Sequence, residues 1–151
     1  LHASPNHPKS RGEITLNSSD PYDYPKILFN YLKEEEDLKQ TRECIHVARK
    51  ILSQPALAEH AGDEVGPGFD AQSDDELNEY VRSKADTAYH PCGTCKMGVD
   101  GMAVVDQNLK VNGIGNLRVI DASVIPEIPS ANLNAPTLMI AEKGSEAILN
   151  N

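Results

Sequence analysis

The longest regular pattern in the sequence is helical and runs from Glu34 to Leu52. Apolar side chains recur there at the spacing that places them on one face of a helix: Leu38, Cys44, Ile45, Val47, Ala48, Ile51 and Leu52. The acidic residues 34–37 suit the positive end of the helix dipole, and Arg49 and Lys50 suit the negative end. Pro55 marks the stop. This is the most strongly predicted element of the chain.

Shorter elements are predicted on either side of this helix. Residues 13–16 alternate polar and apolar side chains before a turn-forming run, which predicts a short strand. Pro21 and Pro25 then favour an extended loop. A capping-box pattern, Ser73 with Glu76, predicts the start of a short second helix.

Beyond residue 86 the sequence changes to Gly-rich loops between short apolar runs. Three of these runs are predicted to be strands: residues 103–105, 109–111 and 117–120. A final helix is predicted over residues 136–149, because Leu138, Ala141, Ser145 and Ile148 can share one helical face. Pro136 is tolerated in a first helical turn.

Composition excludes several classes of protein. The 151 residues are enough for one domain, and the net charge of −9 argues against a nucleic-acid partner. No run approaches the roughly 20 apolar residues that a membrane span needs. The polar start at Leu1, without Met, indicates a segment of a longer polypeptide. Three cysteines are an odd number and favour a reducing compartment. We therefore expect a cytoplasmic protein, with peripheral attachment to the inner membrane as the alternative.

The first candidate for chemistry is the run from His90 to Gly98. A neutral imidazole in a turn-rich loop at a cleft can accept a proton, although a histidine held by a backbone partner is the more common case. Cys92 and Cys95 form a CxxC pair, which is compatible with a redox site or half of a zinc site. A second pair of ligands is missing from the sequence nearby, so buried inert thiols are the favoured interpretation.

The second candidate is the run from Ser130 to Thr137, directly before the last helix. Free N–H groups at a helix start attract negative charge, and the Asn132 amide can donate to an oxygen. Asn134 is expected to cap the helix, which is the more common role of such a residue. Asp121 and Ala122, after the predicted strand 117–120, fit either a strand-end turn or a ligand contact.

Taken together, these runs resemble the C-terminal region of the glucose-methanol-choline (GMC) oxidoreductases. The resemblance lies in the order and spacing of His90-Pro-Cys-Gly-Thr-Cys-Lys-Met-Gly, Leu117-Arg-Val-Ile-Asp-Ala-Ser-Val-Ile-Pro and Asn132-Leu-Asn-Ala-Pro-Thr-Leu-Met-Ile-Ala-Glu-Lys. Within the family, the chain looks most like choline dehydrogenases and related bacterial alcohol dehydrogenases. Runs at 7–12, 27–31 and 54–57 extend the resemblance over nearly the whole chain.

This resemblance implies FAD as cofactor and a catalytic pair of His90 and Asn132. The histidine would take the hydroxyl proton of a primary alcohol, choline or similar, while hydride passes to the flavin and an aldehyde forms. Asn132 would bind the substrate oxygen. The cofactor-binding residues by resemblance are Asp121, Ala122, Asn134, Ala135 and Thr137. The electron acceptor would be a quinone or oxygen.

The resemblance also implies an α+β fold made of parts of two domains. Residues 1–85 would belong to an antiparallel-sheet substrate-binding domain, 86–104 to the active-site loop region, and 105–151 to strands and a helix returning to the FAD-binding domain. The GxGxxG dinucleotide fingerprint is absent, so an N-terminal FAD-binding portion is an expected partner and the segment alone should be inactive. An aliphatic-alcohol dehydrogenase, and a non-catalytic CxxC metal-binding or interaction fragment, remain the alternatives.

Overall fold

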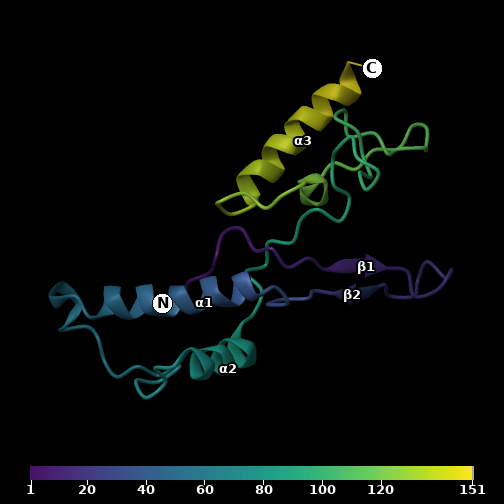
Figure 1. Cartoon of the computed structure of the whole chain (residues 1–151). Helices are drawn as coiled ribbons and strands as arrows, with labels where there is room; N and C mark the ends of the chain where they lie inside the picture. Colours follow the sequence, from purple (N-terminus) through teal and green to yellow (C-terminus); the bar gives the residue numbers. More distant parts are fainter. Residues whose placement is uncertain (151) are drawn as a thin grey trace. The chain divides into compact units, whose positions relative to one another are not determined.

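The computed structural model describes residues 1–150, which form two compact units. Unit 1 is residues 1–86, and unit 2 begins at Thr87 (Figure 1). The chain combines helices with one small antiparallel sheet, in agreement with the predicted α+β class. The assignment of residues 1–85, 86–104 and 105–151 to a substrate domain, an active-site loop and an FAD domain stays a prediction.

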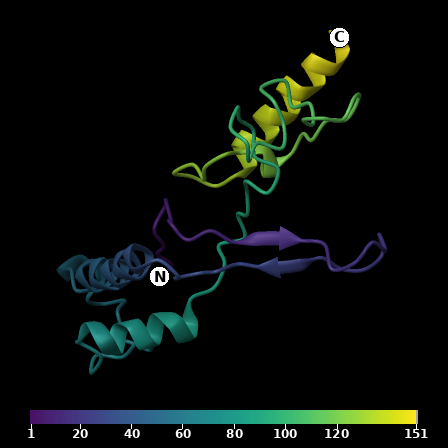
Figure 2. The ribbon, with the colours of Figure 1, turned by 45° about the vertical axis from the view of Figure 1, so that its right-hand side comes forward.

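The sheet of unit 1 has two short strands, β1 (Glu13–Thr15) and β2 (Lys26–Leu28). They pair antiparallel, as the two oppositely directed arrows in Figure 2 show. In this pairing Ile14 lies opposite Ile27. The strand predicted at 13–16 is confirmed, whereas β2 lies where an extended loop was predicted. Three residues after Pro25 are too few to show an alternating pattern. All six strand residues are exposed, so this pair alone buries no core.

The core of unit 1 lies between two helices, α1 (Glu35–Leu52) and α2 (Asp74–Lys84), which lie side by side in Figure 1. Its buried apolar side chains are Leu38, Leu77 and Val81. The long predicted helix is thus confirmed to within one residue at its start. The predicted capping box of α2 is also confirmed: Ser73 Oγ accepts from Glu76 N–H, and Glu76 Oε2 accepts from Ser73 N–H at 2.9 Å.

Charged side chains join the loops of unit 1 to α1. Asp37 is 2% exposed, and its two carboxylate oxygens accept from the N–H groups of Lys9 (2.6 Å) and Ser10 (2.7 Å). Burial works to raise the pKa of this carboxyl, but these donors outweigh it and hold the pKa below its usual range. Arg49 pairs with Glu64 at 2.9 Å and also donates to the Gly68 and Ala71 carbonyls. Each end of α1 therefore holds a segment that has no regular secondary structure.

Unit 2 contains none of the three predicted strands. Within the described residues, the runs 103–105, 109–111 and 117–120 make only isolated bridges, Met97 with Val105, Val105 with Val111 and Lys110 with Arg118. A tight turn, in which Leu109 N–H donates to the Asp106 carbonyl, interrupts the first two runs. The pairings end after one residue because the chain turns again before a ladder can form.

An apolar cluster and a long helix hold unit 2 together. The buried side chains of the cluster are Val105, Leu109, Val124, Ile125, Leu133 and Ile140. The helix, α3 (Asn134–Leu149), begins two residues before the predicted start and contains Pro136 in its first turn, as predicted. Gly144 of α3 lies against Ile120, where an added Cβ would come within 2.5 Å of the isoleucine side chain. No helix among residues 1–150 is long and apolar enough to cross a membrane.

Candidate active site

The His90 loop has a constrained backbone on both sides of the histidine. Tyr89, directly before it, has φ of 59°, in the left-handed region that side chains other than glycine rarely adopt, and Gly93 has φ of 89°. A turn follows, in which Lys96 N–H donates to the Gly93 carbonyl at 3.1 Å. His90 itself is half-buried. Strained backbone of this kind is common where a fold must aim a functional side chain.

The end of this loop is bonded to the predicted cofactor turn. Cys95 N–H donates to the Ser123 carbonyl at 3.0 Å, and Met97 N–H donates to the Val124 carbonyl at 2.8 Å. The turn is a short 3-10 helix, η2 (Ala122–Val124), and the Asp121 carboxylate caps it by accepting from Ser123 N–H at 2.8 Å. Asp121 therefore lies in a turn, although the strand predicted before it does not form, and its contact with a ligand stays a prediction.

The start of α3 differs from the prediction. The N-cap is Leu133, which gives no side-chain cap, so the expectation that Asn134 caps the helix is wrong. Asn134 is instead the first helical residue and is exposed, as is Ala135. A side chain can cap only from a non-helical position ahead of the first turn, and Asn134 is already inside that turn.

The backbone of the first turn of α3 leaves two donors for a ligand. Thr137 N–H and Oγ1–H both donate to the Leu133 carbonyl, at 2.9 and 2.7 Å, so the Thr137 amide is already used. Pro136 has no N–H. The N–H groups of Asn134 and Ala135 have no partner inside the helix, because first-turn amides lack a preceding carbonyl. The open end of the helix is thus at residues 134 and 135.

One apolar cluster brings the three predicted segments together. Cys92 from the His90 loop, Ala122 and Val124 from η2, and Leu133 beside Asn132 all pack on the core of unit 2. Asn132 is exposed next to the buried Leu133. Within residues 1–150, the side chains of His90 and Asn132 make no hydrogen bond or ion pair, so both remain open to a ligand.

Within the described residues, the two cysteines of the CxxC pair form no disulfide. Cys92 and Cys95 are half-buried and unbonded to each other, and Cys92 packs on the apolar cluster. No group of three or more potential metal ligands occurs in the described part of the chain. This arrangement is typical of cysteines that pack as small apolar side chains.

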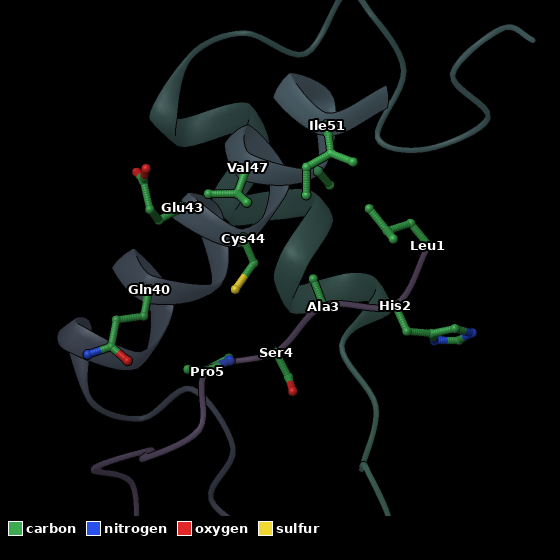
Figure 3. Close-up of a pocket in the computed structure, with 11 residues that line it drawn as sticks. Leu1, His2, Ala3, Ser4, Pro5, Gln40, Glu43, Cys44, Val47 and Ile51 are labelled. Atoms are coloured by element: carbon green, nitrogen blue, oxygen red, sulfur yellow. The ribbon is translucent and has the colours of Figure 1, made fainter. Parts of the chain in front are cut away.

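A hollow in the described part of the chain contains none of the predicted site residues. It lies in unit 1, where the first five residues of the chain face α1, and has a volume of about 510 Å³ (Figure 3). Cys44, Val47 and Ile51 of α1 contribute its apolar wall. Burial, reinforced by the Glu43 carboxylate, raises the pKa of the Cys44 thiol, so the hollow favours an unreactive thiol. From the sequence alone, Cys44, Val47 and Ile51 are recognisable only as part of the apolar face of the predicted helix.

Comparison with known proteins identifies relatives over nearly the whole chain. The family model described as GMC oxidoreductase matches residues 8–141. An "Oxygen-dependent choline dehydrogenase" of Klebsiella pneumoniae subsp. pneumoniae is 53% identical over 139 residues, which cover 92% of this chain and 25% of that protein. The chain spans about a quarter of the length of such curated relatives.

Two solved structures are also similar to nearly the whole of this chain. Pyridoxine 4-oxidase from Mesorbium loti superposes with a TM-score of 0.90 at 33% identity, covering 97% of this chain and 28% of that one. An FAD-dependent oxidoreductase from Chaetomium thermophilum gives a TM-score of 0.89 at 27% identity, covering 95% and 25% of the two chains.

Proposed function

The chain belongs to the GMC oxidoreductase family, and from this premise we propose that it is the C-terminal catalytic part of an FAD-dependent enzyme that oxidises a primary alcohol to its aldehyde. The observation that carries the proposal is the family match over residues 8–141, which includes all the predicted site residues. The 53% identity to a choline dehydrogenase supports an alcohol as substrate.

Two features of unit 2 fit a flavin. The uncapped start of α3 offers the N–H groups of Asn134 and Ala135 to an electron-rich ring edge, and the helix dipole favours negative charge there. The Asp121–Ala122 turn, bonded to the His90 loop, offers backbone to the rest of the cofactor. Thr137 supports the site indirectly, by holding the Leu133 carbonyl. When bound, FAD supplies the hydride acceptor.

His90 is proposed to accept the hydroxyl proton of the substrate. Its imidazole makes no hydrogen bond among the described residues, and the later part of its loop is fixed to η2 by the backbone bonds of Cys95 and Met97, which leaves the ring available to a substrate. A general base must reach the proton it removes within hydrogen-bond distance, and a fixed loop serves that requirement.

Asn132 is proposed to donate a hydrogen bond to the substrate oxygen. Its amide is exposed immediately before α3, while its neighbour Leu133 is anchored in the core. As the hydroxyl loses its proton, charge grows on that oxygen, and a fixed donor stabilises it. In this proposal His90 accepts the hydroxyl proton, and Asn132 donates a hydrogen bond to the substrate oxygen.

The substrate is proposed to be choline or a similar primary alcohol, with an aliphatic alcohol as the alternative. The electron acceptor would be oxygen or a quinone, and the N-terminal FAD-binding portion of the longer protein would complete the site. We further propose a cytoplasmic location.

Anaerobic stopped-flow mixing of the full-length protein with choline tests this function. Loss of the oxidised-flavin absorbance, with an aldehyde as product, is the expected result, and 1-hexanol in place of choline tests the aliphatic alternative. A flavin that neither alcohol reduces would contradict the proposal.

A further inference from the structure

The His90 loop is bonded to η2 by two backbone hydrogen bonds. Cys95 N–H donates to the Ser123 carbonyl at 3.0 Å, and Met97 N–H donates to the Val124 carbonyl at 2.8 Å. Both acceptors are main-chain carbonyls, so their positions are set by the backbone of η2 and not by side-chain rotamers. The place of the loop in unit 2 therefore depends on the shape of η2.

Gly93 lies between His90 and these two bonds and runs along the same segment. Its φ of 89° is in the left-handed region. A Cβ added to it would lie 3.4 Å from the carbonyl oxygen of Ile125, the residue directly after η2. Cys92 packs on the apolar cluster that contains Val124. The loop is thus held from the second residue after His90 onward.

The shape of η2 in turn depends on Asp121. Its Oδ1 atom accepts from Ser123 N–H at 2.8 Å, and its carbonyl accepts from Val124 N–H at 3.3 Å. Because η2 is only three residues long, it has few backbone bonds of its own. An Asp side chain that accepts from the N–H two residues ahead is a common way to fix such a turn. Asp121 makes no ion pair among residues 1–150, so the turn is the contact that its carboxylate serves.

We propose that Asp121 is a positioning residue for His90: its carboxylate fixes η2, and the carbonyls of η2 fix the loop that carries the base. This inference rests on the proposed function in taking His90 as that base. The role requires an acceptor oxygen in the right place and not a negative charge, because the group that it bonds is a neutral backbone N–H.

Flavin reduction in the full-length protein tests the effect on the chemistry, by anaerobic stopped-flow mixing with choline, or with 1-hexanol if only that alcohol reduces the wild type. Asp121→Ala should slow reduction by about 10- to 100-fold at a flavin content near that of the wild type, because a small displacement of a base is costly. Asp121→Asn should stay within about threefold, since its amide oxygen can accept the same bond. The double variant with His90→Ala should be no slower than His90→Ala alone, because residues that act through one group are not additive.

Hydrogen–deuterium exchange of the same full-length proteins tests the effect on the loop without turnover. A peptide covering residues 92–98 should exchange faster in Asp121→Ala than in the wild type, and at the wild-type rate in Asp121→Asn. Asp20→Ala is the matched control. The Asp20 carboxylate also accepts from the N–H two residues ahead, that of Tyr22 at 2.9 Å, but it does so in unit 1, so neither exchange in this peptide nor flavin reduction should change.

Several results would overturn the proposal. Unchanged exchange or unchanged flavin reduction in Asp121→Ala would show that the carboxylate does not hold the loop or that its hold does not matter. Equal losses in the alanine and asparagine variants would show that the charge is needed, and loss of flavin from both would assign the carboxylate to the cofactor. A double variant slowed by the full product of the two single effects would separate Asp121 from His90.

Two provisions keep the test decisive. If Asp121→Ala does not fold, Asp121→Gln takes its place, because its amide is one methylene too long for the turn. If no alcohol reduces the flavin of the wild type, the proposed function fails, and the exchange experiment still decides whether Asp121 holds the loop.

Discussion

The two units of the chain differ in how their polar groups are used. In unit 1 the buried carboxylate of Asp37 accepts two backbone N–H groups, and Arg49 pairs with Glu64 and donates to the Ala71 carbonyl, although its Nη1 atom is buried without a partner. In unit 2 the start of α3 has no side-chain cap, and Nε and Nη2 of Arg118 are buried without a partner among the described residues. The charged side chains beside α1 in unit 1 are thus used mainly to hold that unit together, whereas the first-turn N–H groups of α3 in unit 2 remain for a ligand.

The two units also differ in the regularity of their backbone. Unit 1 buries its core between two regular helices, while unit 2 wraps irregular loops around an apolar cluster and one helix. Functional residues are often found on loops that a rigid scaffold positions. The comparison predicts that substitutions of His90 and Asn132 in unit 2 affect activity and that substitutions in unit 1 affect stability.

The largest effect is expected for His90→Ala in the full-length enzyme. Loss of a general base should lower kcat by about two to four orders of magnitude, with the flavin content nearly unchanged. Steady-state kinetics and the flavin-to-protein absorbance ratio measure the two quantities. His60→Ala, at an exposed position of unit 1, is the control and should leave both unchanged. Activity retained within a few-fold in the His90 variant would remove this residue from the chemistry.

Asn132→Ala should have the next largest effect. A hydrogen bond that strengthens as charge develops is worth about 2–4 kcal/mol, and the loss should fall on kcat rather than KM. Asn134→Ala is the matched control, because Asn134 is exposed and does not cap α3, so it should change neither stability nor flavin reduction much. If flavin reduction slows more in the Asn134 variant than in the Asn132 variant, Asn134 must be the residue that donates to the substrate oxygen.

Asp37→Asn tests the prediction that substitutions in unit 1 affect stability. An amide cannot accept from both the Lys9 and Ser10 N–H groups, so the variant should lose about 1–3 kcal/mol of stability at pH 7 with little change in kcat. Because the pKa of Asp37 is lowered in the fold, its contribution is present above about pH 4, the unfolded value, and is lost as the pH falls through the folded value. The difference in Tm between the two proteins should therefore begin to shrink as the pH falls below about 4. A difference that does not shrink on acidification would contradict the assignment.

Only a small effect on activity is expected for the double variant Cys92→Ser and Cys95→Ser. Thiols that pack as small apolar groups contribute some stability but no chemistry, so turnover should stay within about tenfold. Stoichiometric zinc in the wild-type protein, measured by metal analysis, would be the contrary result, as would loss of turnover on chelation.

Sequence patterns predicted the regular parts of the fold well. The helix from Glu35 to Leu52 and the Ser73–Glu76 capping box follow from local spacing and charge, which need no distant partner. The strands predicted in unit 2 did not form, because runs of three or four apolar residues fit a buried loop as well as a strand. The strand β2 was missed for the related reason that its three residues carry no periodicity.

The candidate site was predicted as three separate segments, and their order and spacing also identified the family. What only the tertiary structure decided is how the segments meet: backbone bonds from Cys95 and Met97 to η2, and one apolar cluster beneath all three. It also decided that Asn134 lies inside the helix and that Nε and Nη2 of Arg118 are buried without a hydrogen-bond partner among the described residues. Local spacing encodes which side chains share a face, but satisfaction of a buried polar group depends on residues far away in the sequence, and these become neighbours only after folding.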